Sequence, residues 1–192
     1  MSAMSPADFE ALYQRQSDPW SYTTSAYERD KYAATLAACG AGPFDSALEL
    51  GASIGVFTAR LAPRCRSLVT VDAAPTAVAR ARERLAGAPG AERVETVVGA
   101  IPHDIPRRRY DLVVASEILY YLSPSDLEAT LEVIGAGTGS GARVVAVHWR
   151  PPGPERPFDA EAVHARLRAA PWATPVSAAP TEDYLLDVVE RR

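Results

Sequence analysis

Apolar residues along the middle of the chain occur in short runs that are separated by stretches with a helical period. The apolar runs predict five β-strands, over residues 46–51, 67–73, 93–99, 111–118 and 142–149. Nearly every position in a run is apolar, as expected for strands whose sheet is covered by helices on both faces. Because strands and helices alternate, the pattern predicts an α/β fold with a doubly wound, mostly parallel sheet.

The stretches between the strands carry signals for helix ends. In residues 25–39, Ser25 and Glu28 have the spacing of a capping box, and Gly40 is placed to end the helix. Apolar residues recur at helical spacing between Ala74 and Leu85. Further helices are predicted over 124–137 and 159–170, and a last strand is predicted in the tail after residue 183.

Composition narrows the class of protein. The chain has 192 residues, of which 47% are hydrophobic and 23% charged, as in ordinary globular domains. A net charge of −4 argues against a general nucleic-acid binder, which would be basic. The first 16 residues lack the apolar core of a signal peptide, and no apolar run reaches the roughly 18 residues that a membrane span needs. We therefore expect a cytoplasmic protein without a membrane segment.

The chain has two cysteines, Cys39 and Cys65. They are too few and too far apart for a disulfide framework or a zinc site. We expect both to be buried free thiols, and we expect no metal.

The loop after the first strand has the sequence GASIG, with Gly51 and Gly55 four residues apart. A dinucleotide-binding loop needs G-x-G-x-x-G, but Ser53 occupies the place of the middle glycine, and no G-K-[ST] phosphate loop is present. Glu49, two residues before the loop, would repel phosphate and attract an ammonium or sulfonium group. By itself, Glu49 could equally be a charge at the end of a strand.

Asp72 ends the second strand, 21 residues after Gly51. A carboxylate at this place can accept hydrogen bonds from both hydroxyls of a ribose. It could also cap the helix that begins near Pro75. A ribose and a positively charged group without phosphate describe S-adenosyl-L-methionine.

Three segments carry a resemblance to a known family: LELGASIGVFTARLAP, VTVDAAP and YDLVVASEILYYL. They resemble class I S-adenosylmethionine-dependent methyltransferases, and more narrowly the nodulation protein S family of N-methyltransferases, whose members act on amino sugars of chitooligosaccharides. The likeness covers roughly residues 18–149. It implies a Rossmann-like sheet of seven strands, the last one antiparallel, and an N-terminal helical lid. It also implies a single domain, 1–192, with a cap over 1–40, a cofactor-binding core over 46–149 and an acceptor-side region over 150–192.

The resemblance implies roles for residues around the cofactor. Gly51 and Gly55 would flank its methionine part, Asp72 would hold the ribose, and Ala73 would touch adenine. Family members often have an acidic residue after the third strand, where this chain has Ala100 and Ile101; Asp104 or a backbone carbonyl is the alternative partner for adenine. The full set of predicted cofactor-binding residues is Glu49, Gly51, Ala52, Gly55, Asp72, Ala73, Ala100, Ile101, Ser116, Trp20 and Tyr27.

Two residues at strand ends are candidates for catalysis. His148 is the first candidate for a general base, because an ordinary histidine has a pKa of about 6.5. Glu117 could bind an ammonium group of the acceptor or orient a hydroxyl. Each also has a purely structural alternative, a packed histidine or a salt bridge. The predicted acceptor-binding residues are Tyr120, Tyr121, Trp149 and His164.

The sequence therefore predicts an S-adenosylmethionine-dependent N- or O-methyltransferase of a small polar acceptor, such as an amino sugar, acting as a monomer or homodimer. Two alternatives stay open at this point. One is a nucleotide-dependent oxidoreductase, and the other is a non-catalytic protein that binds S-adenosylmethionine.

Overall fold

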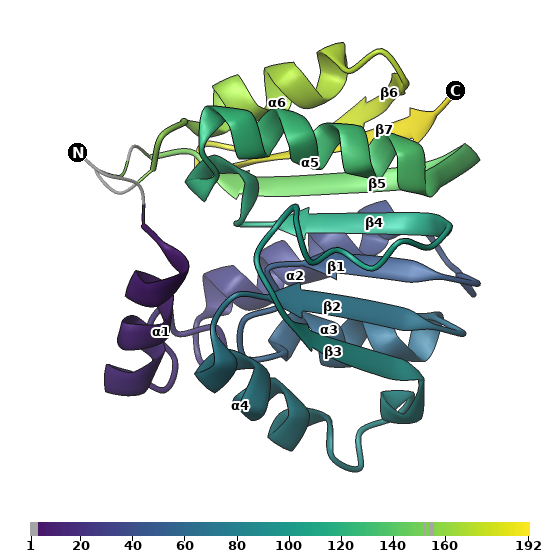
Figure 1. The fold of residues 1–192 in the computed structure, drawn as a ribbon. Coiled ribbons are helices and arrows are strands. Elements are labelled where there is room, and N and C mark those ends of the chain that lie inside the picture. Colours follow the sequence, from purple (N-terminus) through teal and green to yellow (C-terminus); the bar gives the residue numbers. More distant parts are fainter. Residues whose placement is uncertain (1–3, 152, 154–155) are drawn as a thin grey trace.

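Within residues 4–151, 153 and 156–192, which the computed structural model describes, seven strands form one sheet in the order β3-β2-β1-β4-β5-β7-β6 (Figure 1). Strand β7 runs antiparallel to both of its neighbours, and the other neighbouring strands are parallel. The predicted fold class is confirmed, as is the antiparallel last strand. The strands are β1 Ala47–Leu50, β2 Leu68–Asp72, β3 Val94–Val98, β4 Tyr110–Ser116, β5 Thr138–Trp149, β6 Ala173–Ala178 and β7 Tyr184–Arg191.

Helices cover both faces of the sheet. Helices α2 and α3 pack on one face through a core that includes Tyr32, Phe57 and Leu61. Helices α5 and α6 pack on the other face through Leu127 and Leu167, among others. The helices are α1 Pro6–Arg15, α2 Ala26–Cys39, α3 Val56–Leu61, α4 Pro75–Leu85, α5 Pro124–Gly137 and α6 Ala160–Ala169, with short 3₁₀ turns η1 Ala62–Arg64, η2 Ala91–Arg93 and η3 Leu119–Tyr121.

The largest departure from the sequence prediction is helix α1, which the pattern did not reveal. Its N-terminus has a complete capping box between Ser5 and Asp8. It is fastened to α4, because Glu10 accepts hydrogen bonds from the backbone and hydroxyl of Thr76. Arg80 also donates to backbone carbonyls at the end of α1. Figure 1 shows α1 standing beyond the carboxyl ends of β1–β3.

Three local predictions need correction. Ser25 caps α2 by accepting from the Glu28 backbone, but the Glu28 carboxylate turns to Lys31, so only half of the capping box forms. Strand β4 ends at Ser116 and not at 118, because Glu117 has a left-handed φ of +57° that breaks the extended chain. Strand β3 is an edge strand, and Val98 is therefore 45% exposed instead of covered on both faces.

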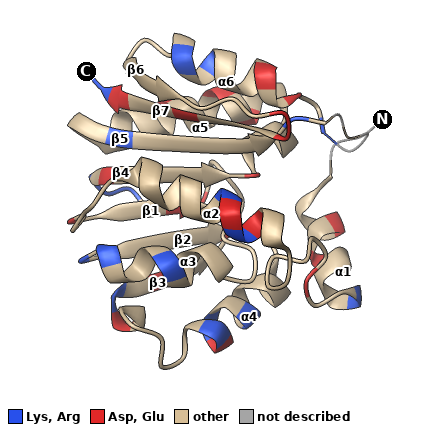
Figure 2. Cartoon of the chain, turned by 180° about the vertical axis from the view of Figure 1, so that it is seen from behind, with Lys and Arg blue, Asp and Glu red and all other residues tan. Residues whose placement is uncertain are grey.

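Other local predictions hold. Gly40 ends α2, and Cys39 and Cys65 are buried free thiols. Acidic and basic residues are intermixed along α2, α4 and α6 (Figure 2). Some form ion pairs between helices, as Arg166 of α6 does with Glu128 of α5. Among the residues described, no helix combines the length and the apolar character that crossing a membrane requires.

Candidate active site

A cavity of about 960 Å³ opens at the carboxyl ends of the parallel strands, where open α/β sheets bind their ligands. This volume lies at the upper end of the range for small-molecule sites. The walls come from α1, the start of α2, and the loops that follow β1, β2, β3, β4 and β5. The predicted site residues on its wall are Trp20, Tyr27, Gly51, Asp72, Ala73, Ala100, Ile101, Ser116, Glu117, Tyr120, Tyr121 and Trp149.

Five predicted site residues are not among those lining the cavity: Glu49, Ala52, Gly55, His148 and His164. Ala52 is only 6% exposed. Gly55 has φ +75° at the start of α3, and a Cβ there would lie 2.9 Å from the Cβ of Ala81. The second glycine of the loop therefore lets α3 approach α4 closely, which is a packing role and not a ligand contact.

Backbone amides of the glycine loop donate hydrogen bonds to other groups of the protein. Gly51, with φ +72°, donates its N–H to the carbonyl of Val71, and a Cβ there would lie 2.9 Å from the Cβ of Ile118. Ser53 is also left-handed, and its N–H donates to the Asp72 carboxylate over 2.7 Å. The amides of Gly51 and Ser53 therefore already have partners and are not free to bind a pyrophosphate.

Asp72 lies on the cavity wall at the end of β2. One of its oxygens accepts from Ser53 N–H, and the other accepts from Ala74 N–H over 2.9 Å. These bonds fix the carboxylate and leave each oxygen with a further lone pair to accept hydrogen bonds. Burial raises the pKa of Asp72, and the two backbone bonds oppose that rise. The helix-cap alternative is met in part, because one bond goes to the residue preceding α4.

Glu49 lies below the loop, 2% exposed, and accepts a hydrogen bond from the hydroxyl of Thr58. Burial raises its pKa to about 8. It is therefore mostly uncharged at neutral pH and not the exposed carboxylate that the sequence suggested.

The loop after β3 forms the far end of the cavity through Gly99, Ala100 and Ile101. Asp104 folds back to accept from the Ala100 N–H and is not among the lining residues. A carboxylate does reach this end from α5: Asp126 lies on the wall. Sequence reasoning missed Asp126, because its place in the first turn of a helix is typical of a capping residue.

Aromatic residues from the N-terminal segment close one side of the cavity. We call Phe9, Tyr13, Trp20 and Tyr22 the aromatic lid; all four line the cavity. Trp20 packs on Tyr13 and on Tyr22, each with ring centroids 5.7 Å apart. Phe9 meets Tyr121 edge to face at 5.1 Å, which joins the lid to the turn after β4. The Tyr13 hydroxyl also bonds the Ser53 hydroxyl.

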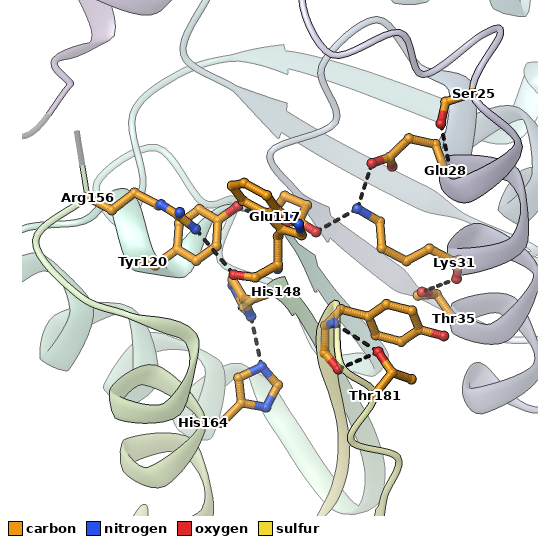
Figure 3. Close-up of polar contacts among 12 residues, drawn as sticks. Ser25, Glu28, Lys31, Thr35, Glu117, Tyr120, His148, Arg156, His164 and Thr181 are labelled. Carbon is orange, nitrogen blue, oxygen red and sulfur yellow. Dashed lines mark hydrogen bonds and ion pairs between the residues drawn. The ribbon is translucent and has the colours of Figure 1, made fainter. Parts of the chain in front are cut away.

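Two charged residues of α2 meet one from the turn after β4 on the cavity wall (Figure 3). We call Glu28, Lys31 and Glu117 the carboxylate–lysine cluster. Lys31 Nζ donates to Glu28 Oε1 over 2.9 Å and to Glu117 Oε1 over 2.6 Å, and the lysine side chain is 1% exposed. Sequence reasoning proposed Glu117 but missed its partners, because 86 residues separate Lys31 from Glu117.

Glu117 is held from several sides. Its second oxygen accepts from the Tyr120 hydroxyl and from the Trp149 N–H, the latter over 3.0 Å. A left-handed non-glycine residue costs roughly 1–2 kcal/mol, so these contacts hold Glu117 in a conformation that it would not otherwise adopt. The salt-bridge alternative for Glu117 is thus present, with Lys31 as the partner.

His148 lies behind the cavity wall, fully buried, in a chain that also contains His164 and Asp187 (Figure 3 shows the two histidines). The Leu119 N–H donates to His148 Nε2 over 3.1 Å, and His148 Nδ1 is 3.0 Å from His164 Nε2. His164 Nδ1 lies 2.9 Å from Asp187 Oδ2. Because the Leu119 N–H donates to His148 Nε2, the hydrogen of the neutral His148 ring lies on Nδ1 and points to His164 Nε2.

The position of this histidine chain argues against His148 as a base toward the acceptor. Its Nε2 already accepts from the backbone, and burial, followed by the neighbouring His164, holds its pKa well below the ordinary value. Burial raises the pKa of Asp187, but the contacts from His164 and Arg168 outweigh this and lower it. His164 is also fully buried and contacts His148 instead of the cavity, so the expected acceptor contact is not seen. Through the bond from the Leu119 N–H to His148, the two histidines support the turn η3, which carries Tyr120 and Tyr121.

The strand order, the single antiparallel strand and the cavity at the strand ends define the class I methyltransferase fold. The structure of the N-methyltransferase NodS from Bradyrhizobium japonicum WM9 in complex with S-adenosyl-L-homocysteine has a TM-score of 0.83, covering 95% of this chain and 97% of that one at 24% identity. The 1,6-didemethyltoxoflavin-N1-methyltransferase of Burkholderia thailandensis has a TM-score of 0.75 at 25% identity, covering 97% and 86%.

The particular family follows from the sequence comparison. The family model described as Nodulation protein S (NodS) matches residues 5–136, which is more than half of the chain. The chain therefore belongs to the nodulation protein S family. Nodulation protein S of Sinorhizobium fredii (strain NBRC 101917 / NGR234) is 34% identical over 106 residues, 55% of this chain and 48% of that protein. The matched region thus spans about half the length of this curated relative.

Proposed function

We propose that this protein is an S-adenosyl-L-methionine-dependent methyltransferase that moves a methyl group to an amine or hydroxyl of a small polar acceptor. The observation that carries the proposal is the arrangement of Asp72 and the glycine loop. A fixed carboxylate with free lone pairs faces the cavity, while the Gly51 and Ser53 amides beside it are already bonded. Such a wall favours a ribose and disfavours a pyrophosphate.

The residues present fit S-adenosylmethionine. Asp72 would accept from the ribose hydroxyls, and Ala73, Ala100 and Ile101 would pack around adenine. Gly51, whose missing side chain keeps the backbone accessible beside Ile118, would lie against the methionine part. Beside the glycine loop the cavity wall carries the Asp72 carboxylate, which would repel a phosphate and weakens the case for a nucleotide-dependent oxidoreductase.

The bound cofactor would supply an electrophilic methyl group on a sulfonium. Displacement needs the acceptor atom to be close and aligned and needs water to be excluded. The aromatic lid would exclude water from one side, and aromatic faces also stabilise sulfonium-type cations. The N-terminal segment, residues 1–40, is accordingly assigned the role of cap and residues 46–149 that of cofactor-binding core.

The acceptor would enter opposite the lid, between the carboxylate–lysine cluster and Trp149. Trp149 is 40% exposed and Tyr120 has its ring beside it, under the Arg156 guanidinium. Exposed aromatic faces and hydrogen-bonding side chains are typical of sugar sites, and together with the N-methyltransferase relatives they favour an amino sugar or sugar-bearing acceptor. We assign the acceptor side to residues 150–192.

Calorimetry tests the cofactor directly. We expect S-adenosylmethionine and S-adenosylhomocysteine to bind with micromolar dissociation constants, on the order of −8 kcal/mol, and a nicotinamide dinucleotide not to bind. Incubation with amino sugars should then give products heavier by one methylene. Binding of the dinucleotide, or no binding of either adenosyl compound, would contradict the proposal.

A further inference from the structure

The carboxylate–lysine cluster holds two carboxylates and one ammonium group. Lys31 bridges Glu28 Oε1 and Glu117 Oε1 and lies 5.0 Å from the centroid of the Tyr27 ring, so the lysine is surrounded by partners. The nearby Arg156 guanidinium donates to the backbone carbonyls of Trp149 and Pro151 instead of a carboxylate of the cluster. With all three residues ionised, the cluster carries one excess negative charge in a place shielded from water.

The two carboxylates differ in the number of hydrogen-bond donors that reach their oxygens. Both oxygens of Glu117 have donors, from Lys31 on one side and from Tyr120 and Trp149 on the other. Glu28 is 8% exposed, and its Oε2 is buried without a hydrogen-bond partner among the described residues. Leaving a buried charged oxygen unpaired is costly, so Glu28 is the carboxylate that awaits a donor.

A second buried polar atom belongs to the neighbouring residue in the sequence. Tyr27, the neighbour of Glu28 at the start of α2, also lines the cavity, and its hydroxyl is buried without a hydrogen-bond partner among the described residues. Two adjacent residues of one helix thus present an acceptor and a hydroxyl to one ligand. A group that carries several N–H donors and one positive charge would satisfy both atoms and cancel the excess charge.

We propose that Glu28, with Tyr27, is the site that recognises a cationic amine on the acceptor and takes its proton. This inference rests on the proposed function and narrows it from an amine or hydroxyl to an amine. The acceptor enters as an ammonium ion, with one N–H directed to Glu28 Oε2 and another to the Tyr27 hydroxyl. A neutral hydroxyl in the same place would leave the excess charge uncompensated.

The proton balance is simple. The N–H bond breaks as an O–H bond forms at Glu28 Oε2, and the electron pair stays on nitrogen. That pair then forms the N–CH₃ bond while the S–CH₃ bond of the methyl donor breaks, with its electrons passing to sulfur. After proton transfer Glu28 is neutral and the Lys31–Glu117 ion pair is balanced.

The surroundings of Glu28 favour the transfer. Burial raises the pKa of Glu28, the Lys31 ammonium opposes that rise, and Glu117 and Asp18 add to it. The titratable and charged groups around it are Tyr27 and Lys31 on α2, Glu117 and Tyr120 after β4, Asp18 in the loop before α2, and Arg156 across the cavity. A carboxylate with a raised pKa is a stronger base toward an ammonium than an ordinary one.

The test compares Glu28→Gln with Asp30→Asn, a charge-matched control on the same helix whose side chain is 77% exposed. Protein saturated with S-adenosylhomocysteine is titrated with methylammonium, ethanolamine and D-glucosamine, and with ethylene glycol and D-glucose as matched hydroxyl compounds. We expect at least one amine to bind wild type and Asp30→Asn at least tenfold more tightly than its hydroxyl counterpart. Glu28→Gln should remove that preference, and Tyr27→Phe should reduce it several-fold.

Affinity for S-adenosylhomocysteine reports separately on the proposed function and on folding. It should be unchanged in Glu28→Gln and Asp30→Asn. If wild type fails to bind S-adenosylhomocysteine, the proposed function itself is wrong. If wild type binds S-adenosylhomocysteine but no amine, binds hydroxyl compounds equally well, or keeps its amine preference in Glu28→Gln, the assignment of Glu28 is overturned while the proposed function stands.

Discussion

The two sides of the cavity are built in different ways. On the side of β1 and β2, the shape is set by backbone: left-handed Gly51 and Ser53, and amides committed to Asp72 and Val71. On the side of β4 and β5, the shape is set by side chains from distant segments, joined through Lys31 and Glu117. On the first side, the Gly51 and Ser53 amides and the Asp72 carboxylate have hydrogen-bond partners within the protein. On the second side, buried polar atoms of Glu28 and Tyr27 have no partner among the described residues.

This difference suits two kinds of ligand, a cofactor that is always the same and an acceptor that can vary between proteins. A wall made of backbone holds one ligand shape and tolerates few substitutions, which suits a cofactor. A wall made of side chains on α2, η3 and β5 can change its chemistry by single substitutions without moving the sheet, which suits an acceptor. The variants below test whether the two sides are independent in this way.

Removing the lysine should have the largest effect. Lys31→Met leaves two buried carboxylates without a cation, and breaking a buried ion pair costs about 3–5 kcal/mol. Urea unfolding monitored by circular dichroism measures this loss. Adding Glu28→Gln and Glu117→Gln to Lys31→Met should recover much of it. In contrast, Arg66→Met, which breaks an exposed pair with Asp45, should have no measurable effect. Equal loss in Lys31→Met and Arg66→Met would show that the cluster contributes little.

Substitution of the ribose carboxylate should come next. Asp72→Ala should weaken binding of S-adenosylhomocysteine by 10- to 100-fold, about 1.4–2.8 kcal/mol, as measured by calorimetry. Asp104→Asn serves as control, since Asp104 bonds only its own loop and does not line the cavity. An Asp72→Ala variant that binds as wild type does would mean that this wall holds something other than the ribose.

Glu49 gives a prediction about pH. Its pKa is about 8 in the folded protein against about 4.5 in the unfolded chain, so between these values the folded state binds more protons. Stability is then lost as pH rises towards 8, by about 2 kcal/mol between pH 6.5 and 8. Urea unfolding across that range should show the decline in wild type and not in Glu49→Gln. A decline of the same size in Glu49→Gln would assign it to another group.

The histidine chain should have the smallest effect on chemistry. His148→Asn keeps a side-chain acceptor for the Leu119 N–H, so turnover should fall by less than tenfold and affinity for S-adenosylhomocysteine should not change. His148→Ala, which leaves that N–H unpaired, should be slower than His148→Asn. If both variants lose turnover completely, His148 acts on the substrate and the positioning role is wrong.

Much of the fold could be predicted because its signals are local. Apolar runs located the strands, and Gly40 marked a helix end that the structure confirms. Helix α1 was missed although Phe9, Leu12 and Tyr13 recur at helical spacing after a capping box. What no local pattern reveals is its position, which depends on Glu10 and Arg80 bonding to other segments. The left-handed Glu117 likewise depends on Lys31 and Trp149, which no local pattern reveals.

The same holds for the site residues: those that follow from local spacing were predicted, and those that depend on distant contacts were missed. Asp72 and Gly51 follow directly from strand and loop spacing and do lie on the cavity wall. His148 was chosen for its ordinary pKa, but burial and its backbone bond remove it from the cavity. Lys31 and Glu28 were overlooked because, on a helix, an i, i+3 pair of opposite charges is usually a surface pair. The contact of Lys31 with Glu117, the residue after β4, is what shows that this pair is buried.

A crystal structure of the protein grown with S-adenosylhomocysteine tests the central claim most directly. The account predicts both ribose hydroxyls within hydrogen-bonding distance of the Asp72 carboxylate, adenine against Ala73 and Ile101, and the sulfur facing the side of the cavity that carries Glu28 and Glu117. A ligand bound elsewhere, or a ribose turned away from Asp72, would contradict it.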